Sequence, residues 1–264
     1  MMEAYTSFAE VYESFMDNIP YEKWCDYIVE LLKEYGICDG IVAELGCGTG
    51  SMTRLLSQAG YDMIGIDNSM DMLDIAREHE YDAEEPCDNA SSSILYLLQD
   101  MREFELYGTV AAVVSVCDSV NYITNPEDLQ QVFRLVNNYL DPNGLFVFDF
   151  HPMEYYERQL AQNTIAEDRE DMSFIWNNQY DSETRLNEYD LSLFVKREDG
   201  LYEKYEETHV QYGYSVSEMI ELVKAAGMKV LHVYDAFTRN EPNENSERVY
   251  IVAMEQPVAG KQYI

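Results

Sequence analysis

The chain of 264 residues is long enough for one large α/β domain or for one domain that carries an insertion. Hydrophobic residues make up 47% of it, which argues against global disorder, and no apolar run reaches the roughly 20 residues that span a bilayer. Its 17 basic and 50 acidic residues give a net charge of −33 without any lysine or arginine cluster, so we expect no nucleic-acid partner. The N-terminus lacks the basic region of a signal peptide, and these features predict a cytoplasmic protein with no membrane partner.

The five cysteines predict neither a disulfide framework nor a structural zinc site. Their number is odd, and no two of them form a C-x-x-C pair, the usual spacing of zinc ligands. We therefore expect reduced, mostly packed thiols and no metal ion. The cysteines are Cys25, Cys38, Cys47, Cys87 and Cys117.

The first part of the chain alternates between helical and extended patterns. Apolar residues recur at helical spacing over 3–17 and 21–36. Strands and helices then follow in turn, which is typical of a parallel, doubly wound sheet. The strands are expected at 41–45, 62–67, 94–100, 109–118 and 144–150, and the helices at 51–60, 70–80 and 126–140.

The pattern changes after the fifth predicted strand. Residues 173–212 alternate between apolar and polar positions without a long helix, and the turn at 197–200 joins two segments as a hairpin. This predicts an antiparallel insertion. A helix at 215–227 and strands at 228–237 and 247–254 then complete the main sheet.

These patterns divide the chain into two parts. Residues 1–151 and 213–264 are expected to form the main α/β domain, in which residues 1–36 are a helical cover. Residues 152–212 are expected to form an inserted antiparallel β subdomain. The insertion would lie over the sheet edge at which open α/β folds bind their ligands.

A glycine-rich turn joins the first predicted strand to the helix after it. Gly46, Gly48 and Gly50 let the backbone approach a ligand, and the helix start offers free N–H groups. A dinucleotide fingerprint needs Gly or Ala one position later, where this chain has Ser51. The turn therefore predicts a nucleotide or ribose site and disfavours an NAD-dependent dehydrogenase.

Two acidic residues flank this turn. Glu44 ends a buried strand, where a carboxylate is costly without a positive or donor partner, so it disfavours a pyrophosphate and favours an ammonium group. Asp67 ends the second strand, 21 residues after Gly46, and an acidic residue at that place accepts hydrogen bonds from a ribose diol. Together they predict a ligand that carries an amino group and a ribose.

Five segments resemble the motifs of the class I S-adenosylmethionine-dependent methyltransferase family. VAELGCGTG (42–50) is similar to its first motif and GIDNSMDML (65–73) to its second. LLQDMREF (97–104), VVSVCDSVNYI (113–123) and LDPNGLFVFDFH (140–151) resemble the stretches at its next three strands. The resemblance implies S-adenosylmethionine as the cofactor. It also implies a Rossmann-like seven-stranded, mostly parallel sheet with an antiparallel last strand, here with an inserted antiparallel β lid after the fifth strand.

The resemblance also implies where the cofactor binds. It places Asp67 on the ribose hydroxyls with Asn68 and Met72 nearby, and it places Asp100 and Met101 at the adenine amino group and ring. The other cofactor-binding residues that it implies are Glu44, Gly46, Cys47, Gly48, Gly50, Cys117 and Asp118.

The segment YTSFAEVYESFMDNIPYEKW (5–24) resembles a branch of the family that acts on small molecules, sugar N-methyltransferases among them. In that branch aromatic residues cover the cofactor, which implicates Tyr5, Tyr12 and Trp24. The chain departs from the branch at Glu13, where aspartate is frequent, and the charge is kept. The family varies at the insertion, so the resemblance implies no particular acceptor.

Three residues are candidates for a catalytic role. His151 follows the fifth strand at the ligand-binding edge, although it could be a loop histidine that closes the strand. His209 lies on the insertion, where a solvated sheet face is the alternative. Tyr12 could face the donor sulfur, because a sulfonium favours acidic or aromatic neighbours. The sequence leaves two roles open for Asp118: it could contact a ligand in the site, or it could cap a helix at 119–123.

The insertion is rich in aromatic residues. One face of its sheet could line an acceptor pocket, or the same residues could pack against the main domain or form a dimer surface. The residues are Phe174, Trp176, Tyr180, Tyr189, Tyr202, Tyr205, Tyr212 and Tyr214.

We therefore predict an S-adenosylmethionine-dependent methyltransferase that transfers the methyl group directly to a small molecule. A methyltransferase acting on RNA or protein is one alternative, and the charge of −33 argues against RNA but not against a basic protein segment. A non-catalytic binding module is the other alternative, and the complete set of glycines and acidic residues argues against it. The sequence leaves open whether the protein forms a homodimer.

Overall fold

The computed structural model describes residues 20–82, 93–197, 199–257 and 261. In these ranges the chain forms a seven-stranded core sheet and a separate four-stranded sheet, which we call the insert. The core strands are β1 (Ile41–Leu45), β2 (Asp62–Asp67), β3 (Leu95–Leu98), β4 (Val110–Ser115), β5 (Leu140–Phe150), β10 (Lys229–Asp235) and β11 (Val249–Met254). The insert strands are β6 (Thr164–Asp168), β7 (Met172–Asp181), β8 (Leu186–Lys196) and β9 (Tyr202–Tyr212). The helices are α2 (Tyr21–Glu34), α3 (Ser51–Gln58), α4 (Met70–Asp82), η1 (Ser119–Tyr122), α5 (Pro126–Tyr139), α6 (Met153–Tyr155), η2 (Tyr156–Leu160) and α7 (Val216–Ala225).

The core sheet has the strand order β10-β11-β5-β4-β1-β2-β3. The five strands from β1 to β5 pair in parallel, whereas β11 pairs antiparallel with both β5 and β10. This confirms the predicted seven-stranded, mostly parallel sheet with an antiparallel last strand. The helix predicted at 3–17 lies outside the described residues, as do Tyr5 and Tyr12.

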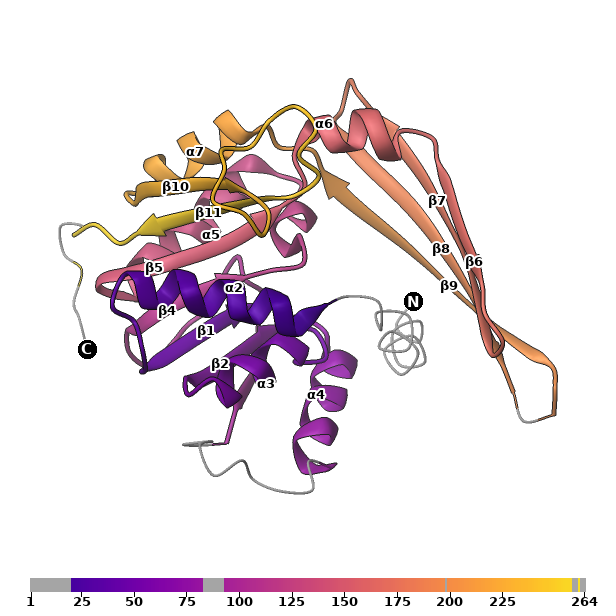
Figure 1. The fold of residues 1–264 in the computed structure, drawn as a ribbon, viewed down its shortest axis with the longest axis horizontal. Coiled ribbons are helices and arrows are strands. Elements are labelled where there is room, and N and C mark those ends of the chain that lie inside the picture. Colours follow the sequence, from indigo (N-terminus) through magenta and orange to yellow (C-terminus); the bar gives the residue numbers. More distant parts are fainter. Residues whose placement is uncertain (1–19, 83–92, 198, 258–260, 262–264) are drawn as a thin grey trace.

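Helices cover both faces of the core sheet, which is why its strands are apolar on both sides. On one face Val113 of β4 packs in a cluster with Phe133 of α5 and with residues of α7. On the other face Val114, the next residue of β4, packs in a cluster with Ile28 of α2 and with residues of α3. The sheet is thus the middle of three layers, and its loops at the carboxyl ends of the parallel strands remain available for a site (Figure 1).

Helix boundaries follow local signals in the sequence. Pro126 opens α5, and the side chain of Asn125 accepts a hydrogen bond from the backbone N–H of Glu127 at 2.8 Å. Ser215 and Glu218 form a capping box at the start of α7. Among the described helices, none combines the length and the apolarity needed for a membrane span.

The insert follows β5 and stands beside the core sheet (Figure 1). Its four strands pair antiparallel in sequence order, which confirms an antiparallel insertion and adds the strand β6 and the short helices α6 and η2 to the predicted elements. Alternate residues of β7, β8 and β9 are buried, as on a sheet with one covered face. We call the covered side the inner face. Its central residues are Phe174, Trp176, Asn178, Tyr189, Leu191, Leu193, Tyr205, Glu207 and His209.

Candidate functional site

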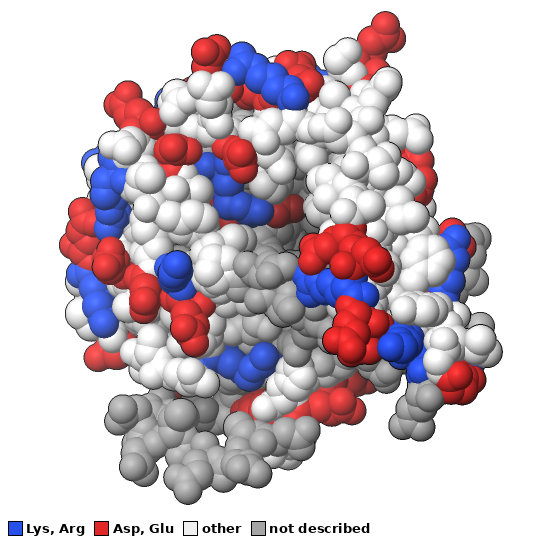
Figure 2. All heavy atoms as spheres, turned by 45° about the vertical axis from the view of Figure 1, so that its right-hand side comes forward, with Lys and Arg blue, Asp and Glu red and all other residues white. Residues whose placement is uncertain are grey.

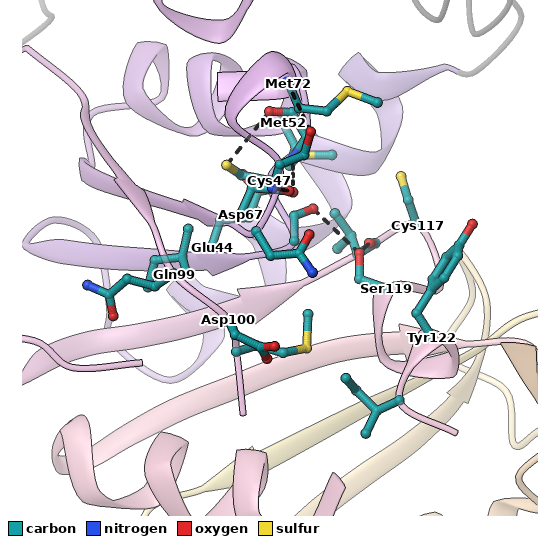
Figure 3. A pocket seen from close by; sticks show the side chains of 18 of the residues that line it. Glu44, Cys47, Met52, Asp67, Met72, Gln99, Asp100, Cys117, Ser119 and Tyr122 are labelled. Carbon is teal, nitrogen blue, oxygen red and sulfur yellow. Dashed lines mark hydrogen bonds between the residues drawn. The ribbon is translucent and has the colours of Figure 1, made fainter. Parts of the chain in front are cut away.

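A cavity of about 400 Å³ lies at the carboxyl ends of β1, β2, β3 and β4. Turns after these four parallel strands form most of its wall, which is the ligand-binding edge of an open α/β sheet. Figure 3 shows Gln99 and Asp100 toward one end of the cavity and Cys117 and Tyr122 toward the other. Residues predicted to bind the cofactor line it. They are Glu44, Gly46, Cys47, Gly48, Asp67, Asn68, Met72, Asp100, Met101 and Cys117.

The turn after β1 holds its backbone open to the cavity. Gly48 has a φ of 53°, and a Cβ built there would meet no heavy atom of the described residues within 4 Å, because that side faces open space. Gly50 has a φ of 76°, and a Cβ there would lie 2.5 Å from the hydroxyl of Tyr96. Gly50 therefore lies behind the cavity wall and permits the close approach of α3 to β3, whereas Gly48 leaves room for a ligand.

Glu44 is the most buried acidic group in the cavity wall. Its residue is 2% exposed, and its carboxyl group accepts a hydrogen bond from the hydroxyl of Thr53. Burial raises the pKa of Glu44 to about 8, although the bond from Thr53 acts in the opposite direction. A neighbouring ammonium group would favour the ionised carboxylate, so this position fits a ligand that carries one.

Asp67 ends β2 and binds the turn after β1. Its Oδ2 accepts a hydrogen bond from the backbone N–H of Gly48 at 2.8 Å, and its Oδ1 accepts one from Ser69 at 2.9 Å. Burial raises the pKa of Asp67, and these backbone donors oppose that shift. Each carboxylate oxygen keeps a further acceptor site, so the group can hold the glycine turn and accept from a ligand diol.

Asp100 forms the other end of the cavity together with Met101. The guanidinium of Arg102 donates from Nε to both carboxylate oxygens, at 2.9 and 3.0 Å. These bonds hold the pKa of Asp100 below its usual value. Arg102 also lines the cavity and was not among the predicted residues. Asp100 is therefore a fixed negative group at the position where the sequence predicts contact with an amino group.

The turn after β4 has a constrained backbone. Cys117 and Asp118 have φ values of 57° and 52°, a conformation that non-glycine residues seldom adopt. The buried carboxylate of Asp149 accepts from the backbone N–H of both residues, at 3.3 and 2.7 Å. Asp149 thus holds the turn, and it places Cys117 in the wall of the cavity.

Arg248 joins the carboxylates below this turn. Its Nη1 lies 2.9 Å from Asp149 Oδ1, and its Nη2 lies 2.8 Å from Asp118 Oδ1. Burial acts to raise the pKa of Asp118, but the neighbouring His151 and Arg248 outweigh it and hold that pKa well below its usual range. The structure therefore places Asp118 in an ion-pair cluster. Asp118 occupies the cap position before η1, as one of the two readings left open by the sequence requires, but its side chain forms no cap bond with that helix.

His151 and Trp24 belong to the same cluster. The imidazole Nδ1 of His151 lies 2.6 Å from the carbonyl oxygen of Glu247, and its Nε2 lies 3.0 Å from Arg248 Nη2. The indole ring of Trp24 lies under the guanidinium of Arg248, at 5.0 Å. None of the predicted residues Trp24, Gly50, Asp118 and His151 is in the cavity wall, and the binding or catalytic roles predicted for them stay predictions.

The insert closes the cavity at the end opposite Asp100. His209 of β9 is part of the wall, together with Tyr122 of η1. The ring of His209 stacks on Tyr189 at 4.8 Å and meets Tyr122 edge-on at 5.8 Å, and the hydroxyls of the two tyrosines are hydrogen bonded. Of the two predicted catalytic histidines, His209 thus faces the cavity, while His151 supports the turn after β4.

Sequence reasoning overlooked Arg248 and Tyr122. Arg248 is the only basic residue between Arg239 and Lys261, which could have marked it as the partner of buried acids. Tyr122 lies inside the segment that resembles the fourth motif, but nothing in its spacing indicates that it reaches the insert.

The strand order with its antiparallel last strand, and the acidic groups at the carboxyl ends of β1, β2 and β3 around one cavity, define a Rossmann-like methyltransferase. The sequence matches a family described as methyltransferase domain over residues 42–144. YqeM of Bacillus subtilis (strain 168), which carries a provisional methyltransferase name, is 34% identical over 250 residues, or 94% of this chain and 96% of that protein.

Solved structures share the fold. An S-adenosylmethionine-dependent methyltransferase from Clostridium acetobutylicum ATCC 824 has a TM-score of 0.84 at 24% identity, over 96% of this chain and 99% of that one. CalS10 from Micromonospora echinaspora, an amino pentose methyltransferase solved with bound S-adenosylmethionine, has a TM-score of 0.73 at 17% identity, over 93% and 97% of the two chains. The chain belongs to the S-adenosylmethionine-dependent methyltransferase family.

Proposed function

We propose that this methyltransferase transfers the methyl group to a small molecule bound between the turn after β4 and the insert. The observation that carries the proposal is that His209 of the insert and Tyr122 line the same cavity as the glycine turn. A cavity of about 400 Å³ has the size of a small-molecule site, and its wall on this side is aromatic. The acceptor would be enclosed by side chains rather than laid on an open surface.

The residues of the chain would bind and align both reactants. Glu44 would receive the amino group of the donor, Asp67 its ribose, and Asp100 with Met101 its adenine. Bound S-adenosylmethionine supplies a methyl group on a positively charged sulfur. Alignment and exclusion of water account for most of the acceleration of such a transfer, so a cavity that the insert covers suits it.

Three residues would serve the acceptor side. His209 would accept a proton from the acceptor if the attacking group carries one, because it lies in the wall of the cavity. His151 would be a second catalytic residue, acting from outside the cavity wall, where its ring lies beside the guanidinium of Arg248. Tyr12, which lies outside the described residues, would cover the sulfur.

The distribution of charge and one relative support a small acceptor. On the face shown in Figure 2, lysine and arginine side chains are scattered among acidic ones and form no broad basic groove for RNA. CalS10, which shares the fold over most of its length, is described as acting on an amino pentose. We propose a cytoplasmic enzyme without a nucleic-acid substrate on these grounds.

Transfer of a labelled methyl group tests the proposal. The full-length protein is incubated with methyl-labelled S-adenosylmethionine and a cell extract, which is then separated into small molecules, nucleic acid and protein. We expect label in the small-molecule fraction and release of S-adenosylhomocysteine. Label recovered mainly in RNA or in protein would overturn the proposal, and binding of the donor without any transfer would indicate the non-catalytic module.

A further inference from the structure

Glu207 is a buried acidic residue on the inner face of the insert. Its residue is 8% exposed, and one carboxylate oxygen, Oε2, lies 2.9 Å from Nε2 of His209, the neighbour on the same face of β9. His209 in turn lines the cavity. Glu207 is therefore an acidic group directly behind the part of the wall that we assign to the acceptor.

The second carboxylate oxygen of Glu207 has no donor. Oε1 is shielded from solvent and forms no hydrogen bond with any residue that the structure describes. A buried carboxylate of this kind is costly, and a buried polar atom without a partner calls for a ligand, an ion or water. Glu207 thus lacks a hydrogen-bond partner for one carboxylate oxygen on the inner face of the insert.

Aromatic rings lie on the same face of the insert as this carboxylate. Leu191 pairs with Glu207 across β8 and β9 and with Trp176 across β7 and β8, so the three side chains form one row on the inner face. In the neighbouring row Tyr189 stacks on His209 and lies 5.1 Å from the ring of Trp176. Faces of tyrosine and tryptophan attract cations, and a carboxylate beside them adds to that attraction.

The basic side chains that the structure describes around the inner face bind other groups, and Arg169 is the first of them, because it binds Glu167, which pairs with Phe174 on this face. The strand registers place Lys196 and Lys204 on the opposite face, and β7 contains neither lysine nor arginine. Arg248, the basic group that reaches this end of the core, binds Asp118 and Asp149. Among the described residues, Glu207 is therefore paired with His209 and with no lysine or arginine.

We propose that Glu207 and the aromatic rings around it form a cation subsite that binds an ammonium group of the methyl acceptor. The proposal rests on the proposed function, because it assigns the acceptor of that reaction to the amines. Where the bound nitrogen is itself methylated, it would first give its proton to His209 and then attack the methyl carbon with the freed electron pair, as the bond from that carbon to sulfur breaks. Glu207 would determine specificity: it would favour a positively charged acceptor over a neutral or anionic molecule of the same shape.

Three small probes of similar shape test the subsite without knowledge of the acceptor. Tetramethylammonium is positive, tert-butanol is neutral and trimethylacetate is negative, and each gives one methyl resonance that broadens when the molecule binds. The full-length protein is first saturated with S-adenosylhomocysteine, and calorimetry records that binding. We expect saturable binding of tetramethylammonium and at least tenfold weaker binding of the other two.

Two charge-removing variants locate the effect. Glu207→Gln keeps the shape of the side chain and should weaken tetramethylammonium binding about tenfold or more, with unchanged affinity for S-adenosylhomocysteine. Glu206→Gln is the matched control, because Glu206 is exposed on the opposite face of the same strand, where it pairs with Lys204, and it should have no effect.

Equal binding of the three probes, or no binding of tetramethylammonium, would overturn the cation subsite even if Glu207→Gln fails to fold. Equal tetramethylammonium affinity in the wild type and Glu207→Gln would overturn the role of Glu207. Failure of S-adenosylhomocysteine to bind the wild type would instead count against the proposed function, so the two failures are distinguishable.

Discussion

Replacement of Glu44 by glutamine should make the protein more stable at neutral pH. The pKa of Glu44 rises from 4.5 to about 8 on burial, so the folded state holds a proton at this site that the unfolded chain has released. The contribution of Glu44 to the free energy of unfolding is therefore fully present below about pH 4.5 and is lost as the pH rises to 8. A neutral glutamine keeps the shape and can accept the bond from Thr53 without this loss.

The size of the effect follows from the two pKa values. Each pH unit between them costs about 1.4 kcal/mol, because the unfolded state gains that much from ionisation while the folded state does not. At pH 7 the accumulated loss is about 3 kcal/mol for a shift from 4.5 to about 8. Glu44→Gln should therefore raise the free energy of unfolding by about 3 kcal/mol at pH 7 and by far less at pH 5.

Urea unfolding of both proteins at several pH values between 5 and 8 measures this difference. Glu30→Gln is the matched control, because it makes the same chemical replacement at an exposed position of α2. Titration with S-adenosylmethionine should also show weaker binding to Glu44→Gln, since a neutral amide attracts an ammonium group less. Equal stability of Glu44→Gln and Glu30→Gln across this pH range would refute the reasoning.

Two further predictions concern Asp67 and Arg248. Asp67→Ala should weaken S-adenosylmethionine binding about tenfold to a hundredfold by calorimetry, because it removes a charged group that holds the glycine turn and that we expect to accept hydrogen bonds from the ribose. His151→Ala should change that affinity far less, and equal losses would contradict the two assigned roles. Arg248→Met should lower the free energy of unfolding by about 3–5 kcal/mol in urea titrations, because it leaves the buried Asp149 and the partly buried Asp118 without their cation. A second substitution, Asp149→Asn, should restore part of the free energy of unfolding that Arg248→Met removes. If the double variant is no more stable than Arg248→Met, the broken ion pair is not the cause of the lost stability.

The sequence predicted the core sheet because its signals are local. Each parallel strand is a short apolar run next to a helical pattern, and the glycines between β1 and α3 mark the turn at which a ligand approaches. Glu44 and Asp67 could be placed because each one ends such a strand. The number of strands in the insert was harder to predict, since the exposed strand β6 has little apolar alternation to mark it.

The acceptor side could not be predicted because its contacts join distant parts of the chain. Asp118 meets Arg248 across 130 positions, and the hydroxyl of Tyr122 meets that of Tyr189 across 67. Alternation of apolar and polar residues predicted the antiparallel strands of the insert, but it could not show which face of β9 the core of the protein covers. That choice depends on η1 and on the turn held by Asp149, and it determines whether His209 faces solvent or the cavity. The same packing leaves Oε1 of Glu207 without a donor among the described residues, so the charge that we expect to select the acceptor is a product of tertiary structure.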